Sequence, residues 1–258
     1  MKLLTKTEQK LANELSSGSV VTLDILSEIA KQKKLMEQST LRKTINTLSK
    51  KGVLMRIVRG TYAVQKDSEF NPYAIARYLS PGAYAGFESA MSIYGYKTSV
   101  TSTIKVVTSG KSFASKKING YKYIMIPMQE MAFGSVFING IAVSSKAKTL
   151  FDCMYKPRYV DDFGAVLTMA KNMDKDDYSE FMEYASLVSS TVFLERSGMV
   201  LEAAKAPEGT TAKILKRIKN PVVSTLKPEI STNKKQQGKY SAKWHIYDNV
   251  GLMEISKW

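Results

Sequence analysis

The chain has 258 residues, of which 44% are hydrophobic, and a formal net charge of +15. That apolar content is enough for a sizeable buried core. With one cysteine, Cys153, and one histidine, His245, the chain can form no internal disulfide and none of the usual Cys/His zinc sites. No apolar run approaches the roughly eighteen residues of a membrane span, and the N-terminus lacks the apolar segment of a signal peptide. We therefore expect a cytoplasmic protein with no cofactor, no metal and no membrane partner.

The positive charge lies at the two ends of the sequence. Residues 1–65 contain twelve lysines and arginines against five acidic residues, and residues 210–258 contain ten against three. The residues between them are nearly balanced, with sixteen against fifteen. A basic patch attracts phosphate with an affinity that falls steeply as salt rises. Lysine-rich surfaces can also serve only solubility, and for the C-terminal segment both interpretations stay open.

Three short helices are predicted in the first fifty residues. Thr5 followed by Glu8 predicts a capping box, and Thr22 and Ser39 are typical caps for a second and a third helix. Each helix has an apolar face with helical spacing. These faces comprise Leu11, Ala12 and Leu15; Ile25, Leu26, Ile29 and Ala30; and Leu41, Ile45 and Leu48. Glycines at positions 18 and 52 are expected to end the first and third helices.

A β-hairpin is predicted directly after the third helix. Residues 53–58 and 61–64 are rich in β-branched and aromatic side chains, and Arg59-Gly60 between them is a plausible turn. Three helices followed by a basic hairpin are the order of a winged helix-turn-helix, which binds duplex DNA. The alternative is a small packed domain whose basic face is merely solvated.

The outward face of the third helix carries hydrogen-bond donors and no carboxylate. If the helix turns about 100° per residue, this face points away from the apolar stripe. The predicted DNA-binding residues are Ser39, Arg42, Lys43, Asn46, Thr47 and Lys50 on the helix, with Arg56 and Arg59 on the hairpin. The helix residues would contact base edges, and the hairpin arginines would contact phosphate or the minor groove.

A second domain is predicted over residues 66–258, after a winged domain over residues 1–65. Asn71-Pro72 is typical of a helix start. Strands are expected at residues 103–108, 121–128 and within 135–143, and Asn119-Gly120 and Asn139-Gly140 are strong hairpin turns. We therefore expect a small antiparallel sheet, and an α+β fold in which this mixed α/β domain follows the winged helix.

Helices dominate the rest of the sequence. Either serine 144 or serine 145 can cap a helix that Pro157 ends, and helical patterns continue over 163–173, 178–187 and 192–204. A basic helix over 211–219 follows, and a final pair of strands is expected at 240–247 and 251–256. The basic residues proposed as a second phosphate-contacting surface are Lys213, Lys216, Arg217 and Lys219.

No catalytic pattern is complete. Residues 108–112 resemble the end of a phosphate-binding loop, but Lys105 stands where that loop requires glycine. Cys153 and His245 have no partner set for nucleophilic catalysis, so we expect no enzyme and no catalytic residues. One alternative is a nuclease in which Glu88, Glu130 and Asp152 converge in space.

Several segments, taken in order, resemble the AbiEi family of antitoxins and transcriptional regulators from type IV toxin–antitoxin (abortive infection) systems. Residues 52–64 are similar to the family's wing, in which an arginine-glycine turn precedes a tyrosine. Residues 83–95 are similar to the helix that opens its second domain, and residues 104–108 to the strand that follows. Residues 145–153 resemble a later helix with an alanine-leucine-aspartate pattern.

The resemblance implies an autoregulating repressor that binds operator DNA in its own promoter. It also implies an antitoxin that counteracts a nucleotidyltransferase-like toxin without a stable complex. Glu88 and Asp152 match family positions, and we interpret both as structural. A winged-helix regulator with no toxin partner remains the other alternative.

Overall fold

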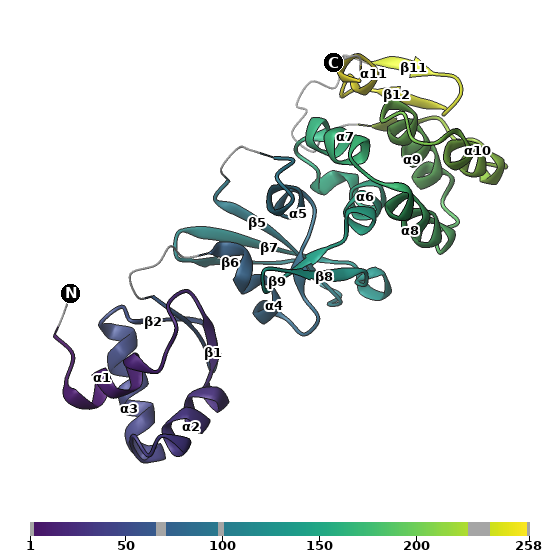
Figure 1. Cartoon of the computed structure of the whole chain (residues 1–258). Helices are drawn as coiled ribbons and strands as arrows, with labels where there is room; N and C mark the ends of the chain where they lie inside the picture. The colour runs from purple at the N-terminus through teal and green to yellow at the C-terminus, as the bar shows by residue number, and fades with distance from the viewer. Residues whose placement is uncertain (1–2, 66–70, 98–100, 227–237, 257–258) are drawn as a thin grey trace.

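The computed structural model describes residues 3–65, 71–97, 101–226 and 238–256. The fold is mixed α+β, built from helices and three sheets. Figure 1 shows an elongated molecule: an N-terminal unit at one end, a sheet in the middle, and a helical bundle with a small C-terminal sheet at the other end. Within the ranges given above, no helix is both long enough and apolar enough to cross a membrane.

The N-terminal unit contains three helices and a three-stranded antiparallel sheet with the order β1-β3-β2. In chain order the elements are α1 (Lys6–Asn13), β1 (Val20–Thr22), α2 (Leu23–Gln32), α3 (Gln38–Lys50), β2 (Leu54–Val58) and β3 (Thr61–Val64). The predicted capping box of Thr5 and Glu8 is confirmed, and Thr22 caps α2. The short strand β1, which pairs with β3, was not predicted from the sequence.

Three details of the predicted helices are wrong. The first helix, α1, ends at Asn13 with Glu14 as its C-cap, so Gly18 does not end it. The helix α3 begins one residue before Ser39, and its N-cap is Glu37, whose side chain makes no capping hydrogen bond. Ile25, assigned to the apolar face of α2, is 44% exposed, whereas Leu26 and Ala30 of that face are buried. The α2 helix is ten residues long and packs through a narrow stripe, so Ile25 at its first turn lies beyond the core.

The middle of the chain forms one six-stranded sheet with the order β6-β7-β5-β4-β9-β8. Its strands are β4 (Tyr84–Ala85), β5 (Thr103–Thr108), β6 (Ala114–Ile118), β7 (Tyr121–Pro127), β8 (Ser135–Ile138) and β9 (Ile141–Ser144). Three short helical segments accompany them: η1 (Pro72–Ile75) continued by α4 (Ala76–Leu79), then α5 (Glu88–Ile93), and later η2 (Gln129–Met131).

The sheet is mixed, and the prediction of a small antiparallel sheet is wrong. Both Asn-Gly turns are present with positive φ at each residue, which is the geometry of tight hairpins, and they join β6 to β7 and β8 to β9. However, β5 pairs with β7 in parallel, and so does β4 with β9. Local turn chemistry specifies only the two hairpins, whereas the parallel pairings join segments that are distant in the sequence.

The helical end contains α6 (Lys146–Tyr155), η3 (Pro157–Tyr159), α7 (Phe163–Lys171), α8 (Lys175–Ser186), α9 (Thr191–Ala203) and α10 (Glu208–Arg217). The serine at 145 caps α6 and Asp174 forms a capping box with α8, both as predicted. The largest core cluster joins these helices to the sheet through residues such as Phe151 and Ile126.

The chain ends in a second three-stranded sheet, with the order β10-β12-β11, and a short helix. These elements are β10 (Ser224–Leu226), β11 (Lys239–Ser241), β12 (Ile246–Asp248) and α11 (Leu252–Ile255). The predicted pair of strands at 240–247 and 251–256 is therefore wrong. Residues 240–247 contain a turn and parts of two paired strands, and the stretch after Gly251 is helical.

The C-terminal sheet is fastened to α9 by Trp244. The Trp244 side chain is 1% exposed, and a Cβ added to Gly198 would lie 2.0 Å from its ring. Its indole nitrogen donates a hydrogen bond to Glu202. Among the described residues of the basic C-terminal segment, Trp244, Ile246 and Leu252 thus belong to the main core.

The N-terminal unit packs against the middle sheet. Ile57 and Ala63 from the hairpin share one core cluster with Ile104 and Val106 of β5. In addition, the Lys116 ammonium on β6 donates a hydrogen bond to the Ile57 carbonyl. The hairpin β2–β3 is therefore held between the N-terminal helices and the second part of the chain, which fixes the position of its arginines relative to β6.

Candidate nucleic-acid interface

The helix α3 presents its predicted polar face to solvent. Its apolar side chains Leu41, Ile45 and Leu48 are buried in the N-terminal core. Of the predicted face, the exposed residues are Ser39, Arg42, Lys43, Asn46 and Lys50. Thr47 is half-buried, and its hydroxyl donates to the carbonyl of Lys43 in the preceding turn. Five of the six predicted helix residues are therefore available for contact with a partner.

Arginines from the hairpin and side chains from α3 line one concavity of about 230 Å³. Arg42 and Asn46 enter it from α3, and Arg56 and Arg59 enter it from β2 and the turn. Gly60 at that turn has a φ of +77°, so the sharp reversal that places Arg59 at the tip needs glycine. Among the residues that the structure describes, no carboxylate lines this concavity.

The chemistry of this concavity suits duplex DNA. Guanidinium groups form paired hydrogen bonds with guanine or phosphate, and the asparagine amide matches the major-groove edge of adenine. Of the other predicted residues, Ser39, Lys43, Thr47 and Lys50 do not line the concavity and continue along α3. The structure thus brings together four of the eight predicted residues and arranges the others on the same helix.

A second concavity extends the basic surface onto the middle sheet. It encloses about 470 Å³ between β2 and β6, and Arg56 and Arg59 line it together with Lys116 and Lys117. Sequence reasoning missed these two lysines, although four of the five residues of β6 are exposed and two of them are cationic. Because both concavities share the hairpin arginines, the cationic surface is continuous from α3 to β6.

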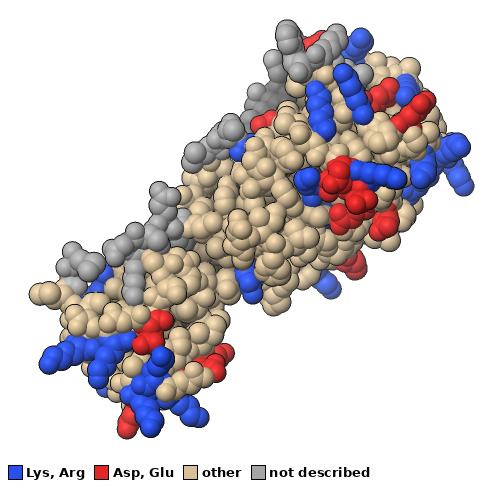
Figure 2. Space-filling model, in the orientation of Figure 1, with Lys and Arg blue, Asp and Glu red and all other residues tan. Residues whose placement is uncertain are grey.

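Figure 2 shows lysines and arginines gathered on the N-terminal unit, whereas the face of the middle sheet in this view is mostly uncharged. Cations and acidic residues are mixed at the helical end. There Lys213, Lys216 and Lys219 are exposed, as a phosphate-contacting surface requires. Arg217 is engaged differently, because its guanidinium donates to the carbonyls of Ala185 and Val188. It closes the C-terminal end of α8 and is half-buried.

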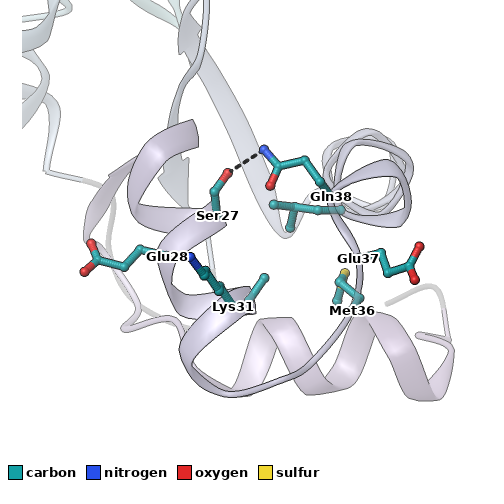
Figure 3. Close-up of a pocket in the computed structure, with 8 residues that line it drawn as sticks. Ser27, Glu28, Lys31, Met36, Glu37 and Gln38 are labelled. Atoms are coloured by element: carbon teal, nitrogen blue, oxygen red, sulfur yellow. Dashed lines mark hydrogen bonds between the residues drawn. The ribbon is translucent and has the colours of Figure 1, made fainter.

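A third concavity, of about 450 Å³, lies between α2 and α3 on the N-terminal unit. Figure 3 shows Glu28, Lys31 and Glu37 around it, with Met36 among the lining side chains. The Gln38 amide donates to the Ser27 hydroxyl at 3.4 Å and ties the two helices together. Two carboxylates at its rim make this concavity unsuited to phosphate, in contrast to the two basic ones.

The carboxylates considered for a nuclease are placed in separate environments. Glu88 pairs with Lys105 at 2.7 Å, and Asp152 pairs with Lys148 one helical turn earlier, with both side chains fully buried. Glu130 lies exposed in η2. Across the described ranges, no three His, Cys, Asp or Glu residues are grouped so that they could hold a metal ion.

Burial dominates the titration of the groups around Asp152. It raises the pKa of Asp152 to about 6, because loss of hydration outweighs the attraction of Lys148. Burial also raises the pKa of the Cys153 thiol well above its usual range, so this cysteine is a packing group. The Lys148 ammonium lies 4.9 Å from the ring centres of Phe133 and Phe151. These contacts describe a buried structural pair, as the sequence interpretation of Asp152 expected.

No family model and no curated protein matches this chain. Among solved structures, the chain is similar to the crystal structure of the RV2827C protein from Mycobacterium tuberculosis, with a TM-score of 0.68. The two sequences are 15% identical, and the match covers 98% of this chain and 94% of the other. At that identity the likeness shows that the two chains share a fold over nearly their whole length.

Proposed function

We propose that this protein is a transcriptional repressor that reads an operator upstream of its own gene through a winged helix-turn-helix formed by residues 1–65. One observation carries the proposal: Arg42 and Asn46 of α3 face the same concavity as Arg56 and Arg59 of the hairpin. The order of helices and strands in this unit is the order that winged domains have, with β2 and β3 as the wing.

In this proposal α3 enters the major groove, which is wide enough for a helix. Arg42 and Asn46, with Lys43, contact base edges, and each good paired contact discriminates against a wrong base by about 1–3 kcal/mol. Arg56 and Arg59 bind phosphate or enter the adjacent minor groove. Lys117 on β6 reaches the phosphates that flank the site, because it lines the concavity that adjoins the wing.

We also propose that the protein is the antitoxin of a type IV toxin–antitoxin system, which counteracts a nucleotidyltransferase-like toxin without a stable complex. The support is the sequence resemblance to the AbiEi family. Three of the resembling segments pack together in the second part of the chain. A Cβ added to Gly86 would lie 2.6 Å from Val107 and 3.8 Å from Asp152. The segments that carry the resemblance are therefore joined in one core.

The DNA-binding proposal is tested with a duplex from the upstream region and a scrambled duplex of the same composition. Lys43→Ala combined with Asn46→Ala, and separately Arg42→Ala combined with Asn46→Ala, should abolish the preference for the upstream duplex in gel shifts. Lys10→Ala removes an exposed cation from α1 and should leave the preference intact. Unchanged shifts for both double variants would refute α3 as the reading helix.

The antitoxin proposal is tested independently of DNA binding. A neighbouring gene for a nucleotidyltransferase-like toxin is the first expectation. Expression of that toxin should arrest growth, and co-expression of the proposed antitoxin should restore it. Rescue should survive the Arg42→Ala, Asn46→Ala double variant, because the proposed antitoxin part lies beyond residue 65. If no such neighbour exists, or if co-expression gives no rescue, the protein is a regulator without a toxin partner.

A further inference from the structure

Two lysines lie directly opposite each other on neighbouring strands of the middle sheet. In the antiparallel register of β6 with β7, Lys117 pairs with Lys122, so their side chains lie on the same face. Both residues are exposed, and within the described part of the chain neither ammonium group forms an ion pair. Like charges in directly opposite positions destabilise a sheet, so this pair lowers the stability of the hairpin that carries it.

Protection of the sheet edge explains only one of these lysines. Lysines on an edge strand hinder pairing with other chains, and β6, which carries Lys117, is an edge strand. In contrast, β7 lies between β6 and β5, so Lys122 protects no edge. Its neighbour on β5 is Thr103, which supplies no negative charge. An exposed lysine pair that the sheet does not need points to an anionic partner.

The nearest carboxylates on this face are already engaged. Lys105 lies two residues after Thr103 on β5, and its ammonium group pairs with Glu88 at 2.7 Å and with Asp161 at 2.6 Å. These carboxylates are therefore neutralised by Lys105 within the sheet, and the exposed lysine pair stays cationic.

The lysine pair adjoins the basic surface of the winged unit. Lys117 lines the concavity of about 470 Å³ together with Arg56 and Arg59, and among the described residues no carboxylate lines it. Lys116 in the same strand fixes the distance between the two parts of this surface, because it donates a hydrogen bond to the Ile57 carbonyl on β2. The lysine pair therefore lies beside the wing, on which the proposed function places duplex DNA.

We propose that Lys117 and Lys122 form a second contact with duplex DNA, on phosphates that flank the base pairs contacted by α3. This inference rests on the proposed DNA binding, and it extends the interface from the winged unit to the middle sheet. The repulsion within the pair is relieved when a phosphate lies between the two ammonium groups. A lysine binds phosphate as a point charge, so this contact adds affinity without base preference.

The test uses the full-length protein with the upstream duplex and a scrambled duplex of the same composition. For Lys117→Ala combined with Lys122→Ala, the slope of log affinity against log salt should fall by about 1.8, because each lost phosphate contact removes about 0.9. Affinity for the two duplexes should fall by the same factor, so the preference for the upstream duplex remains. Lys171→Ala combined with Lys175→Ala removes two exposed lysines from the helical end and is the charge-matched control, which should keep the wild-type slope.

A single charge reversal separates DNA binding from folding. Lys122→Glu places a carboxylate opposite Lys117 and replaces a repulsive pair with an attractive one. Its thermal midpoint should therefore equal or exceed that of the wild type, whereas its affinity for both duplexes should fall. A purely structural role of Lys122 would not produce these opposite changes.

Three results would overturn the proposal. The double lysine variant could keep the wild-type slope, the charge-matched control could lower the slope equally, or Lys122→Glu could bind both duplexes as the wild type does. Failure of the operator proposal gives a different result, in which the wild type shows no preference for the upstream duplex. A slope that still falls by about 1.8 in the double variant would then support the lysine pair as a contact with duplex DNA of any sequence.

Discussion

Removing the two wing arginines should change how DNA affinity depends on salt. Arg56 and Arg59 are exposed and line both basic concavities, and of the two roles proposed for them this prediction takes the one in which each binds a phosphate. Each lost phosphate contact lowers the slope of log affinity against log salt by about 0.9. For Arg56→Ala with Arg59→Ala the slope should therefore fall by about 1.8.

This slope has a direct experimental meaning. Between about 50 and 200 mM salt, the loss of affinity should be about 12-fold smaller in the double variant than in the wild type. Anisotropy titrations with the upstream duplex at four salt concentrations measure the slope. Lys10→Ala, which removes an exposed cation from α1 that lines neither basic concavity, is the control and should keep the wild-type slope. An unchanged slope in the arginine variant would refute the assignment of the wing to phosphate.

Three further predictions concern the fold that supports these sites. Lys148→Met should destabilise the protein by about 3–5 kcal/mol in urea unfolding, because it leaves Asp152 buried without its cation. Adding Asp152→Asn should recover much of this loss. A cost of Lys148→Met below about 1 kcal/mol would contradict the role of Lys148 as the partner of Asp152. The pKa of Asp152 is higher in the folded protein than in the unfolded chain, so protonation of this carboxyl group stabilises the fold. This contribution is fully present below the ordinary carboxyl pKa and is lost as pH rises through about 6. The stability of the wild type relative to Asp152→Asn should therefore increase from pH 7 to pH 5, and a pH-independent difference would count against the shift. Gly198→Ala should cost about 1–3 kcal/mol through the clash with Trp244, whereas Gly209→Ala, with open space around it, should be near neutral.

Local signals predicted the parts of the fold that local chemistry determines. The capping box at Thr5, the cap at Asp174 and the Asn-Gly turn at 119–120 are all present. Each depends on residues within a few positions of one another, so a single stretch of sequence contains the whole interaction. The apolar stripe of α3 likewise predicted which side chains stay exposed for a partner, because the helical repeat alone determines that face.

Contacts between segments that are distant in the chain could not be predicted from the sequence. The parallel pairing of β5 with β7 depends on where β6 folds back, and β4 is too short to show a pattern. The basic concavity at Lys116 and Lys117 exists because the hairpin packs on the middle sheet, which no local motif indicates. Lys148 is fully buried, and only its spacing of four residues from Asp152 gave a signal for the pair.

For Arg217 the sequence predicted a surface contact, whereas the structure uses the side chain within the fold. In the sequence it belongs to a run of basic residues on one helix, and its charge alone suggested a phosphate contact. In the structure its guanidinium closes the end of α8 through two backbone carbonyls. Whether a surface cation is available for a partner depends on neighbours that tertiary packing supplies.

Lysine acetylation in the presence and absence of the upstream duplex tests the central claim most directly. With the full-length protein, mass spectrometry follows the reactivity of exposed lysines at the two ends of the molecule. If α3 reads DNA, the duplex should slow acetylation of Lys43 and Lys50 and leave Lys10 unchanged. Protection of Lys213 and Lys216 with no protection of Lys43 and Lys50 would contradict the account.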